Sequence, residues 1–177
     1  MSADRLHLVV ILGSVREGRF GPVVADWFVG YAKQRADLTV DVVDLADTPL
    51  PAAERMGAAD AFVVITPEYN HSYPGPLKLA IDSIGEPWRA KPVGFVSYGG
   101  MSGGLRAVEP LRVVFAELHA VTVRNTVSFH SAWERFDERG RPREADAVNA
   151  AADALLDQLA WWAQALRAAR AATPYVA

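Results

Sequence analysis

Five apolar runs alternate with segments of helical spacing, and this alternation constrains the fold more than any other feature of the chain. The runs at 8–12, 61–66 and 92–97 are apolar almost throughout, which is typical of strands covered on both faces of a parallel sheet. Weaker strand patterns occur at 39–45 and 120–127. Alternating strands and helices predict an α/β fold with a parallel sheet and right-handed crossovers. For five strands in one domain we expect the order 2-1-3-4-5, in a three-layer sandwich with helices on both faces.

Helices are predicted between and after these strands, at 22–35, from Leu77 onward, at 102–119 and at 143–172. Pro22 suits the first turn of a helix, because that position needs no N–H. Pro110 lies inside the third helix, where it removes one backbone hydrogen bond. Residues 46–57 contain two prolines and a glycine, and we expect them to be irregular.

The composition limits the functions that the chain can have. Its 177 residues predict a single domain, 1–177. Cysteine is absent, which excludes disulfides, thiol catalysis and iron–sulfur clusters and is compatible with a cytoplasmic location. The net charge of −3 argues against a nucleic-acid partner. No apolar run reaches the roughly 18 residues of a membrane span, so we expect no membrane partner.

The first candidate site is the loop after the run at 8–12, which contains Ser14, Arg16, Arg19 and Gly21. It leads into a predicted helix, whose free N–H groups and positive dipole favour an anion. Guanidinium groups match the geometry of phosphate oxygens, and the Ser14 hydroxyl can donate a further hydrogen bond. The loop has neither the G-x-G-x-x-G pattern of dinucleotide sites nor the G-K-[ST] of a P-loop, so a phosphate monoester is the expected ligand.

A second candidate loop follows the run at 61–66 and begins with Pro67, Glu68, Tyr69 and Asn70. Proline has no N–H to give to a sheet ladder, so the strand should stop at Pro67. The loop presents backbone amides, a flat aromatic ring and a side-chain amide at one edge of the sheet. This combination suits a planar ligand with polar ring atoms.

The third candidate loop contains Ser97, Tyr98, Gly99 and Gly100, and two more glycines follow within four residues. So many glycines are costly in chain entropy unless the backbone must approach something closely. A flat ring lying against this backbone would explain them.

Each of the three loops alone also fits an ordinary surface loop. In a sheet of order 2-1-3-4-5, however, the strands before them are neighbours, and ligands bind outside their carboxyl ends, where the strand order reverses. A phosphate site beside a flat polar slot, with no metal site or acid–base pair between them, indicates a mononucleotide cofactor. FMN fits best, with its ring over Gly99 and Gly100 beside Tyr69, and its phosphate at Ser14 and Arg16.

Three segments of the chain together resemble the NAD(P)H-dependent FMN reductase family, a flavodoxin-like group that includes quinone, azo-dye and chromate reductases. The segments are Gly13-Ser14-Val15-Arg16, the long stretch from Pro67 to Asp82, and Ser97 to Gly100. The resemblance implies a flavodoxin-like fold, FMN as cofactor, NADPH or NADH as hydride donor, and a homodimer or homotetramer. Arg19 and Gly21 depart from the family, which usually has serine and asparagine there as phosphate ligands.

The expected reaction is hydride transfer from a nicotinamide to the flavin, and then to a quinone-like or other small electron acceptor. The cofactor carries this chemistry, so we assign no catalytic side chain, and no histidine spacing indicates a metal site. His71 and Met101, in the second and third loops, are expected to contact the substrate. Two other interpretations remain open: a flavodoxin-type electron carrier without nicotinamide turnover, and a scaffold that has lost its cofactor.

Overall fold

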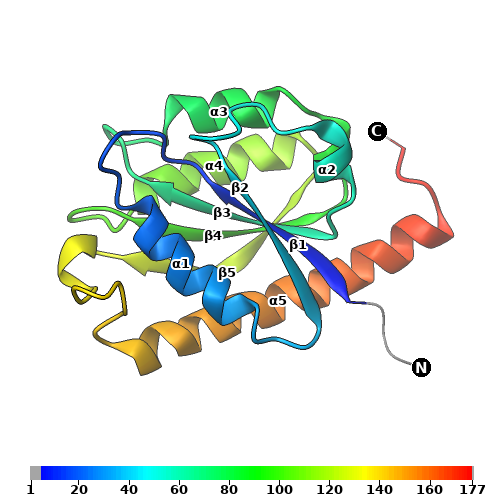
Figure 1. The fold of residues 1–177 in the computed structure, drawn as a ribbon. Coiled ribbons are helices and arrows are strands. Elements are labelled where there is room, and N and C mark those ends of the chain that lie inside the picture. The colour runs from blue at the N-terminus through cyan, green and yellow to red at the C-terminus, as the bar shows by residue number, and fades with distance from the viewer. Residues whose placement is uncertain (1–4, 177) are drawn as a thin grey trace.

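A parallel sheet lies between two layers of helices in the computed structural model, which describes residues 5–176 (Figure 1). The strands are β1 (Leu6–Leu12), β2 (Leu38–Asp44), β3 (Ala61–Pro67), β4 (Pro92–Tyr98) and β5 (Val121–Phe129). Their order in the sheet is β2-β1-β3-β4-β5, and every neighbouring pair is parallel. The predicted strand order and the flavodoxin-like α/β fold are therefore confirmed.

The described residues form five α-helices and two short 3₁₀ turns. These are α1 (Gly21–Ala32), α2 (Ala53–Gly57), α3 (Gly75–Asp82), η1 (Glu86–Trp88), α4 (Leu105–Glu117), η2 (Ala132–Glu134) and α5 (Ala145–Ala172). Helix α2 lies where an irregular segment was expected, and its Met56 is fully buried in the core. Helix α4 begins later than predicted, because Gly103 and Gly104 adopt positive φ angles that a right-handed helix does not contain. Within residues 5–176, no helix has both the length and the apolar character of a membrane span.

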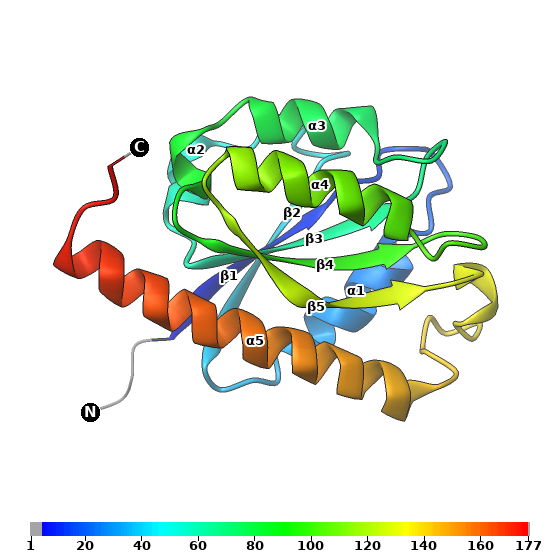
Figure 2. The same ribbon diagram turned by 180° about the vertical axis from the view of Figure 1, so that it is seen from behind.

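Each face of the sheet has its own core, because successive residues of a strand point to opposite sides. Val10 and Val63 belong to the core beneath α1 and α5. Val9 and Phe62, their neighbours in sequence, belong to the core that contains Met56 of α2 and the apolar faces of α3 and α4. The two views show these helix layers on opposite sides of the sheet (Figures 1 and 2).

The carboxyl ends of the central strands meet at one edge of the sheet. The register pairs Leu12 of β1 with Ile65 of β3, and Pro67 of β3 with Tyr98 of β4. The three loops that the sequence singles out begin directly after these positions, so the fold places them side by side.

Candidate functional site

The loops that follow β1, β3, β4 and β5 border a pocket of about 290 Å³ at the carboxyl edge of the sheet. Its lining consists of Ser14, Arg16, Glu17, Gly18, Arg19, Phe20, Pro67, Glu68, Tyr69, Tyr98, Gly99, Gly100, Ala132 and Trp133. All three predicted loops therefore contribute to one pocket. The other predicted site residues are outside this lining: Gly21, Asn70, His71, Ser97 and Met101.

Ser14, Arg16 and Tyr69 form one wall of the pocket. Ser14 is buried just after β1, and its Oγ lies 2.7 Å from Tyr69 Oη. Arg16 Cζ lies 3.6 Å from the centre of the Tyr69 ring, in a cation–π arrangement. The exposed guanidinium of Arg16 has no hydrogen-bond or ion-pair partner among residues 5–176, so all its donors are available to a ligand.

Arg19 lies in the same loop but is held by Asp44 at the end of β2. Both Nη atoms of Arg19 donate to the carboxylate at 2.6 Å, and Nη1 also donates to the carbonyl of Ser14. Burial opposes ionisation of Asp44, but the hydrogen bonds from Arg19 and from the Ala46 N–H outweigh it and lower the pKa of the carboxyl. The ion pair therefore fixes the backbone of the loop at Ser14.

Tyr98, the last residue of β4, places its hydroxyl at the amino end of α1. The residue is 5% exposed, and its Oη has no hydrogen-bond partner among the described residues. Burial raises the pKa of Tyr98 well above its usual value, so the hydroxyl keeps its proton. A buried donor without an acceptor, beside the amino end of a helix of 12 residues, fits an oxyanion such as a phosphate.

Glu68 connects the second loop to the third. Its N–H donates to the Tyr98 carbonyl at 3.1 Å, and its carboxylate accepts hydrogen bonds from the Ser102 hydroxyl and, at 3.3 Å, from Arg106. Burial alone would raise the pKa of Glu68, but these two donors lower it below the usual value. The carboxylate thus stays ionised and holds the two loops at a fixed separation.

A tight turn follows Glu68 at Tyr69–Ser72. Tyr69 and Ser72 exchange backbone hydrogen bonds of 2.8 and 3.0 Å. The central residues, Asn70 and His71, have φ angles of 48° and 70°, which makes this a type I′ turn. Both residues are exposed, and both are outside the pocket lining.

The loop after β4, which contains Gly99 and Gly100 and is called the glycine loop, is hydrogen-bonded to the end of β5 and the segment after it. Gly99 donates its N–H to the Phe129 carbonyl, while the carbonyls of Gly99 and Gly100 accept from Ala132 and Ser131 at 3.0 and 2.9 Å. These three hydrogen bonds place Trp133 against Gly100, where a Cβ built on the glycine would lie 3.6 Å from the indole.

Ser97, Met101 and Trp133 differ most from the sequence predictions in their placement. Ser97 is fully buried and donates to the Gly103 carbonyl, so its side chain supports the loop from below. Met101 is 82% exposed and is outside the lining. Trp133 was not predicted as a site residue, although the segment that carries it follows β5 at the same edge of the sheet.

A sequence profile of the NADPH-dependent FMN reductase family matches residues 6–134. The chain belongs to this family. Its membership confirms the expected enzyme class, an NAD(P)H-dependent FMN reductase, and the expected cofactor, FMN.

Curated relatives agree with the family assignment. An NAD(P)H-dependent FMN reductase of Schizosaccharomyces pombe is 35% identical over 119 residues, which are 55% of this chain and 60% of that protein. An FMN-dependent NADPH-azoreductase of Staphylococcus haemolyticus is 31% identical over 85% of this chain and 92% of its own length. A quinone reductase of Escherichia coli K12 is 34% identical over 68% and 75% of the two chains.

A solved structure supports the fold. FerB, a flavoenzyme NAD(P)H:(acceptor) oxidoreductase from Paracoccus denitrificans, superposes with a TM-score of 0.70 over 87% of this chain and 97% of its own, at 22% identity. At this identity the likeness bears on the fold alone.

The residues of this FMN reductase fit its cofactor. The unpaired guanidinium of Arg16 and the unpartnered hydroxyl of Tyr98 are the donors that would hold a phosphate. The N–H of Gly100, a partly buried residue in the pocket lining, would add a further donor, since no described residue accepts from its amide. Arg19, where the family usually has serine, uses both Nη atoms within the protein, so its predicted contact with phosphate competes with an existing ion pair.

Proposed function

We propose that this FMN reductase passes hydride from NADPH or NADH, by way of FMN, to a quinone-like or other small electron acceptor. The observation that carries the proposal is the pocket at the carboxyl edge, in which a loop with two arginines adjoins residues of the glycine backbone and aromatic rings. The names of two relatives, an azoreductase and a quinone reductase, support an aromatic or quinoid acceptor. FMN, when bound, supplies the hydride chemistry, and the protein supplies position and electrostatics.

The first loop is assigned to the phosphate. Ser14 and Arg16 provide a hydroxyl and a free guanidinium, Gly21 provides the first amide of α1, and Tyr98 Oη provides a buried donor. Charge-assisted hydrogen bonds of this kind contribute about 1.5–3 kcal/mol each. Arg19 is assigned the indirect role of holding the loop through Asp44.

The second and third loops are assigned to the flavin ring. The segment Pro67 to Asn70 borders the ring with Tyr69, and Glu68 fixes the distance to the glycine loop. The backbone of Gly99 and Gly100 forms the floor, with Ser97 supporting it from within the sheet. The Gly100 N–H is the amide available to stabilise negative charge on the reduced ring.

The acceptor and the nicotinamide are assigned to the open mouth of the pocket. His71 and Met101 are exposed on loops that border the pocket, and Trp133 has a flat apolar side chain that is 62% exposed. Exposed aromatic rings of this kind suit planar substrates. Neither His71 nor Met101 lines the pocket in the structure, so their contact with substrate remains a prediction.

Turnover of a nicotinamide separates the proposal from the alternative of a flavodoxin-type carrier. The protein is saturated with FMN and mixed with NADPH or NADH, and absorbance at 340 nm is followed with a panel of quinones, azo dyes, nitroaromatics and free FMN. Steady loss of absorbance that depends on the acceptor supports the proposal. An unchanged absorbance with every acceptor, in protein that retains FMN, indicates a carrier.

We further propose that residues 1–177 act as one domain in a cytoplasmic homodimer or homotetramer. The exposed side chains of Leu79 on α3 and Val113 on α4 support an interface on that helix layer. Light scattering on the eluted FMN-bound protein gives the oligomeric state, and a monomeric mass over the working concentration range refutes this part.

A further inference from the structure

A second cavity, of about 610 Å³, opens at the opposite edge of the sheet from the flavin pocket. Its lining consists of Ala53, Gly57, Glu86, Pro87, Arg89, Lys91, Arg170, Pro174 and Tyr175. Lys91 directly precedes β4, and Gly57 ends the helix before β3. The cavity therefore lies at the amino ends of the strands, and the FMN reductase reaction described above does not use it.

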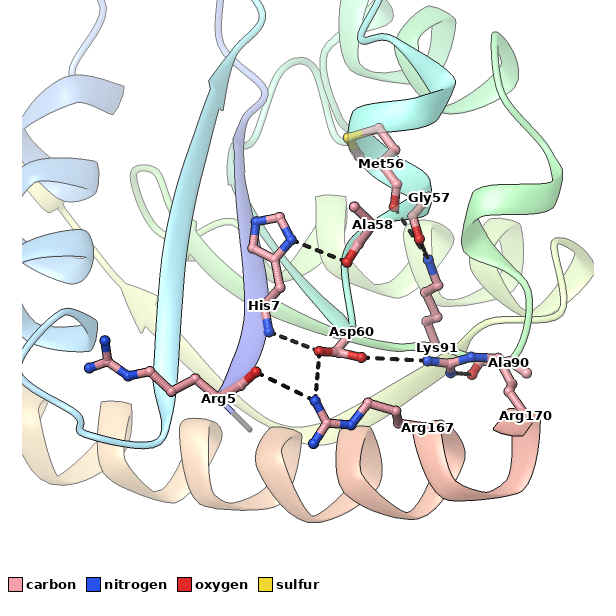
Figure 3. Close-up of polar contacts among 10 residues, drawn as sticks. All are labelled: Arg5, His7, Met56, Gly57, Ala58, Asp60, Ala90, Lys91, Arg167 and Arg170. Atoms are coloured by element: carbon pink, nitrogen blue, oxygen red, sulfur yellow. Dashed lines mark hydrogen bonds and ion pairs between the residues drawn. The ribbon is translucent and has the colours of Figure 1, made fainter. Parts of the chain in front are cut away.

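Lys91 is a buried cation beside this cavity. It is 6% exposed, and its ammonium donates to the carbonyls of Gly57 and Met56 at 2.7 and 3.3 Å, at the end of α2 (Figure 3). These two bonds use two of its three donors. Among residues 5–176, no carboxylate lies within ion-pair distance of the ammonium. A buried charge without a counter-ion is costly.

Asp60, the carboxylate whose charge acts on Lys91, is already bound by other groups. It accepts the His7 N–H at 2.9 Å and a hydrogen bond from Arg167 at 3.3 Å, and it pairs with Arg170 at 3.8 Å. Figure 3 shows these bonds converging on Asp60, with Lys91 turned away toward α2. Asp60 is therefore a poor counter-ion for Lys91.

The charges that line the cavity are unbalanced. Among the described lining residues, Arg89, Lys91 and Arg170 are cationic, and Glu86 is the single acid. The Arg89 guanidinium is exposed and has no described partner. Burial, together with the charge of Arg170, lowers the pKa of Lys91 to about 8, although Asp60 partly opposes this shift. The surplus of positive charge thus favours either loss of the Lys91 proton or binding of an anion.

Tyr175 forms the remaining wall. Its hydroxyl lies 2.9 Å from His119 Nδ1, and the two rings meet edge to face at 5.8 Å. This contact fastens the segment after α5 beside the cavity. The lining of the cavity thus combines cationic side chains with an aromatic ring.

We propose that this cavity is an anion site that binds the phosphate group of a small molecule between Arg89, Lys91 and Arg170. Guanidinium forks and a compact ammonium are the side chains that bind phosphate oxygens in proteins. The volume exceeds that of inorganic phosphate, so the organic part of a phosphate ester has room along Tyr175. Inorganic phosphate and a phosphate ester share this chemistry, and the experiment distinguishes them.

The test uses the FMN-saturated enzyme, so that the flavin pocket does not compete for phosphate. Isothermal titration with inorganic phosphate, pyrophosphate and ribose 5-phosphate, at constant ionic strength, measures each affinity. Arg89→Ala should weaken binding at least tenfold, because it removes one guanidinium from the proposed site. The fold should stay intact, because the Arg89 side chain has no partner among the described residues. Arg143→Ala, at another exposed arginine without a side-chain partner, should leave binding unchanged.

The three probes also identify the source of the phosphate. Tighter binding of ribose 5-phosphate than of inorganic phosphate supports a phosphate ester, and the reverse supports the free ion. Absence of heat for all three probes, or equal binding by the Arg89→Ala and Arg143→Ala proteins, overturns the proposal.

Proton linkage provides a second test, which a purely structural role of Lys91 would not change. The charged or titratable groups that face the site are Asp60 just before β3, Glu86 of η1 and Arg89 just after it, Arg170 of α5, and the Tyr175–His119 pair. A bound phosphate favours the ammonium, so binding should take up a proton near and above pH 8 and weaken as the pH rises further. Lys91→Met should abolish this uptake. Uptake that persists in that variant assigns the proton to another group and refutes the role of Lys91.

Discussion

The hydroxyl of Tyr98 fills the space directly beneath Gly21, so that a Cβ at position 21 would lie 2.8 Å from the phenolic oxygen. Real Cβ atoms do not come so close, and Tyr98 is buried and has little freedom to withdraw. The family usually has asparagine at the position of Gly21. In this chain a hydroxyl from β4 lies 2.8 Å from the point where that side chain would begin, so a different element places a hydrogen-bond donor beside the first loop.

Replacing Tyr98 with phenylalanine should separate the two roles of this side chain. The apo protein should be as stable as the wild type or more stable, because the removed hydroxyl has no partner, and burying such a group costs about 1–3 kcal/mol. FMN should bind several-fold more weakly, because the phosphate loses a donor. Thermal melts of the apo protein and fluorescence titration with FMN measure both effects. Unchanged FMN affinity would remove Tyr98 from the phosphate site.

Gly21→Ala should destabilise the protein by about 1–3 kcal/mol, the usual cost of overpacking a filled site. Alanine otherwise favours a helix, so the sign of the effect identifies the clash with Tyr98. The double variant Gly21→Ala, Tyr98→Phe should recover most of the loss, since the atom in conflict is the phenolic oxygen. Chemical denaturation of the four proteins completes the cycle, and additive losses would show that the two residues do not interact.

Arg16→Ala should weaken FMN binding about tenfold or more while leaving the melting temperature of the apo protein nearly unchanged. The guanidinium lies on the Tyr69 ring and has no other described partner, so its donors serve the ligand and not the fold. One charge-assisted hydrogen bond accounts for a change of this size. Arg139→Ala, at an exposed arginine outside the pocket lining, is the control. An FMN dissociation constant equal to that of the control contradicts the phosphate assignment.

The strands and the meeting of three loops were predictable because they depend on local patterns and on one topological rule. Continuous apolar runs identified β1, β3 and β4, and the strand order then brought Ser14, Tyr69 and Gly99 to one pocket. The resemblance to the family added the cofactor.

The other features of the fold and the site depend on contacts between residues far apart in the chain, which the local sequence does not reveal. Asp44 resembles any acidic residue near a strand end, and only the fold reveals that it holds Arg19. Trp133 lies in a charged stretch without periodicity, so nothing nearby marks it as a pocket residue. Helix α2 is too short to give a helical pattern, and it forms because Met56 is buried.

Trp133→Ala should raise the KM for a quinone about two- to tenfold with less effect on FMN affinity. The indole lies against Gly100 at the mouth of the pocket, and loss of an aromatic contact costs about 0.5–1.5 kcal/mol. Trp161→Ala is a matched control, since Trp161 is 63% exposed, much like Trp133, but lies on α5. Equal KM values for the two variants would exclude Trp133 from the acceptor site.

Asp44→Asn tests whether Arg19 anchors the phosphate loop or binds the phosphate itself. The ion pair is largely buried, with exposed fractions of 15% and 21%, so its loss should cost about 1–3 kcal/mol at neutral pH. Because the pKa of Asp44 is lowered in the folded protein, this stabilisation is present above the ordinary carboxyl pKa of about 3.9 and is lost as the pH falls through the folded value. The stabilities of wild type and variant should therefore converge once the pH falls below the lowered pKa of Asp44. If Arg19 acts as an anchor, FMN affinity should fall in the variant, because the Ser14 backbone loses its support. If the released guanidinium instead binds phosphate, FMN affinity rises, and the sequence-based prediction of a direct contact by Arg19 holds for the freed side chain.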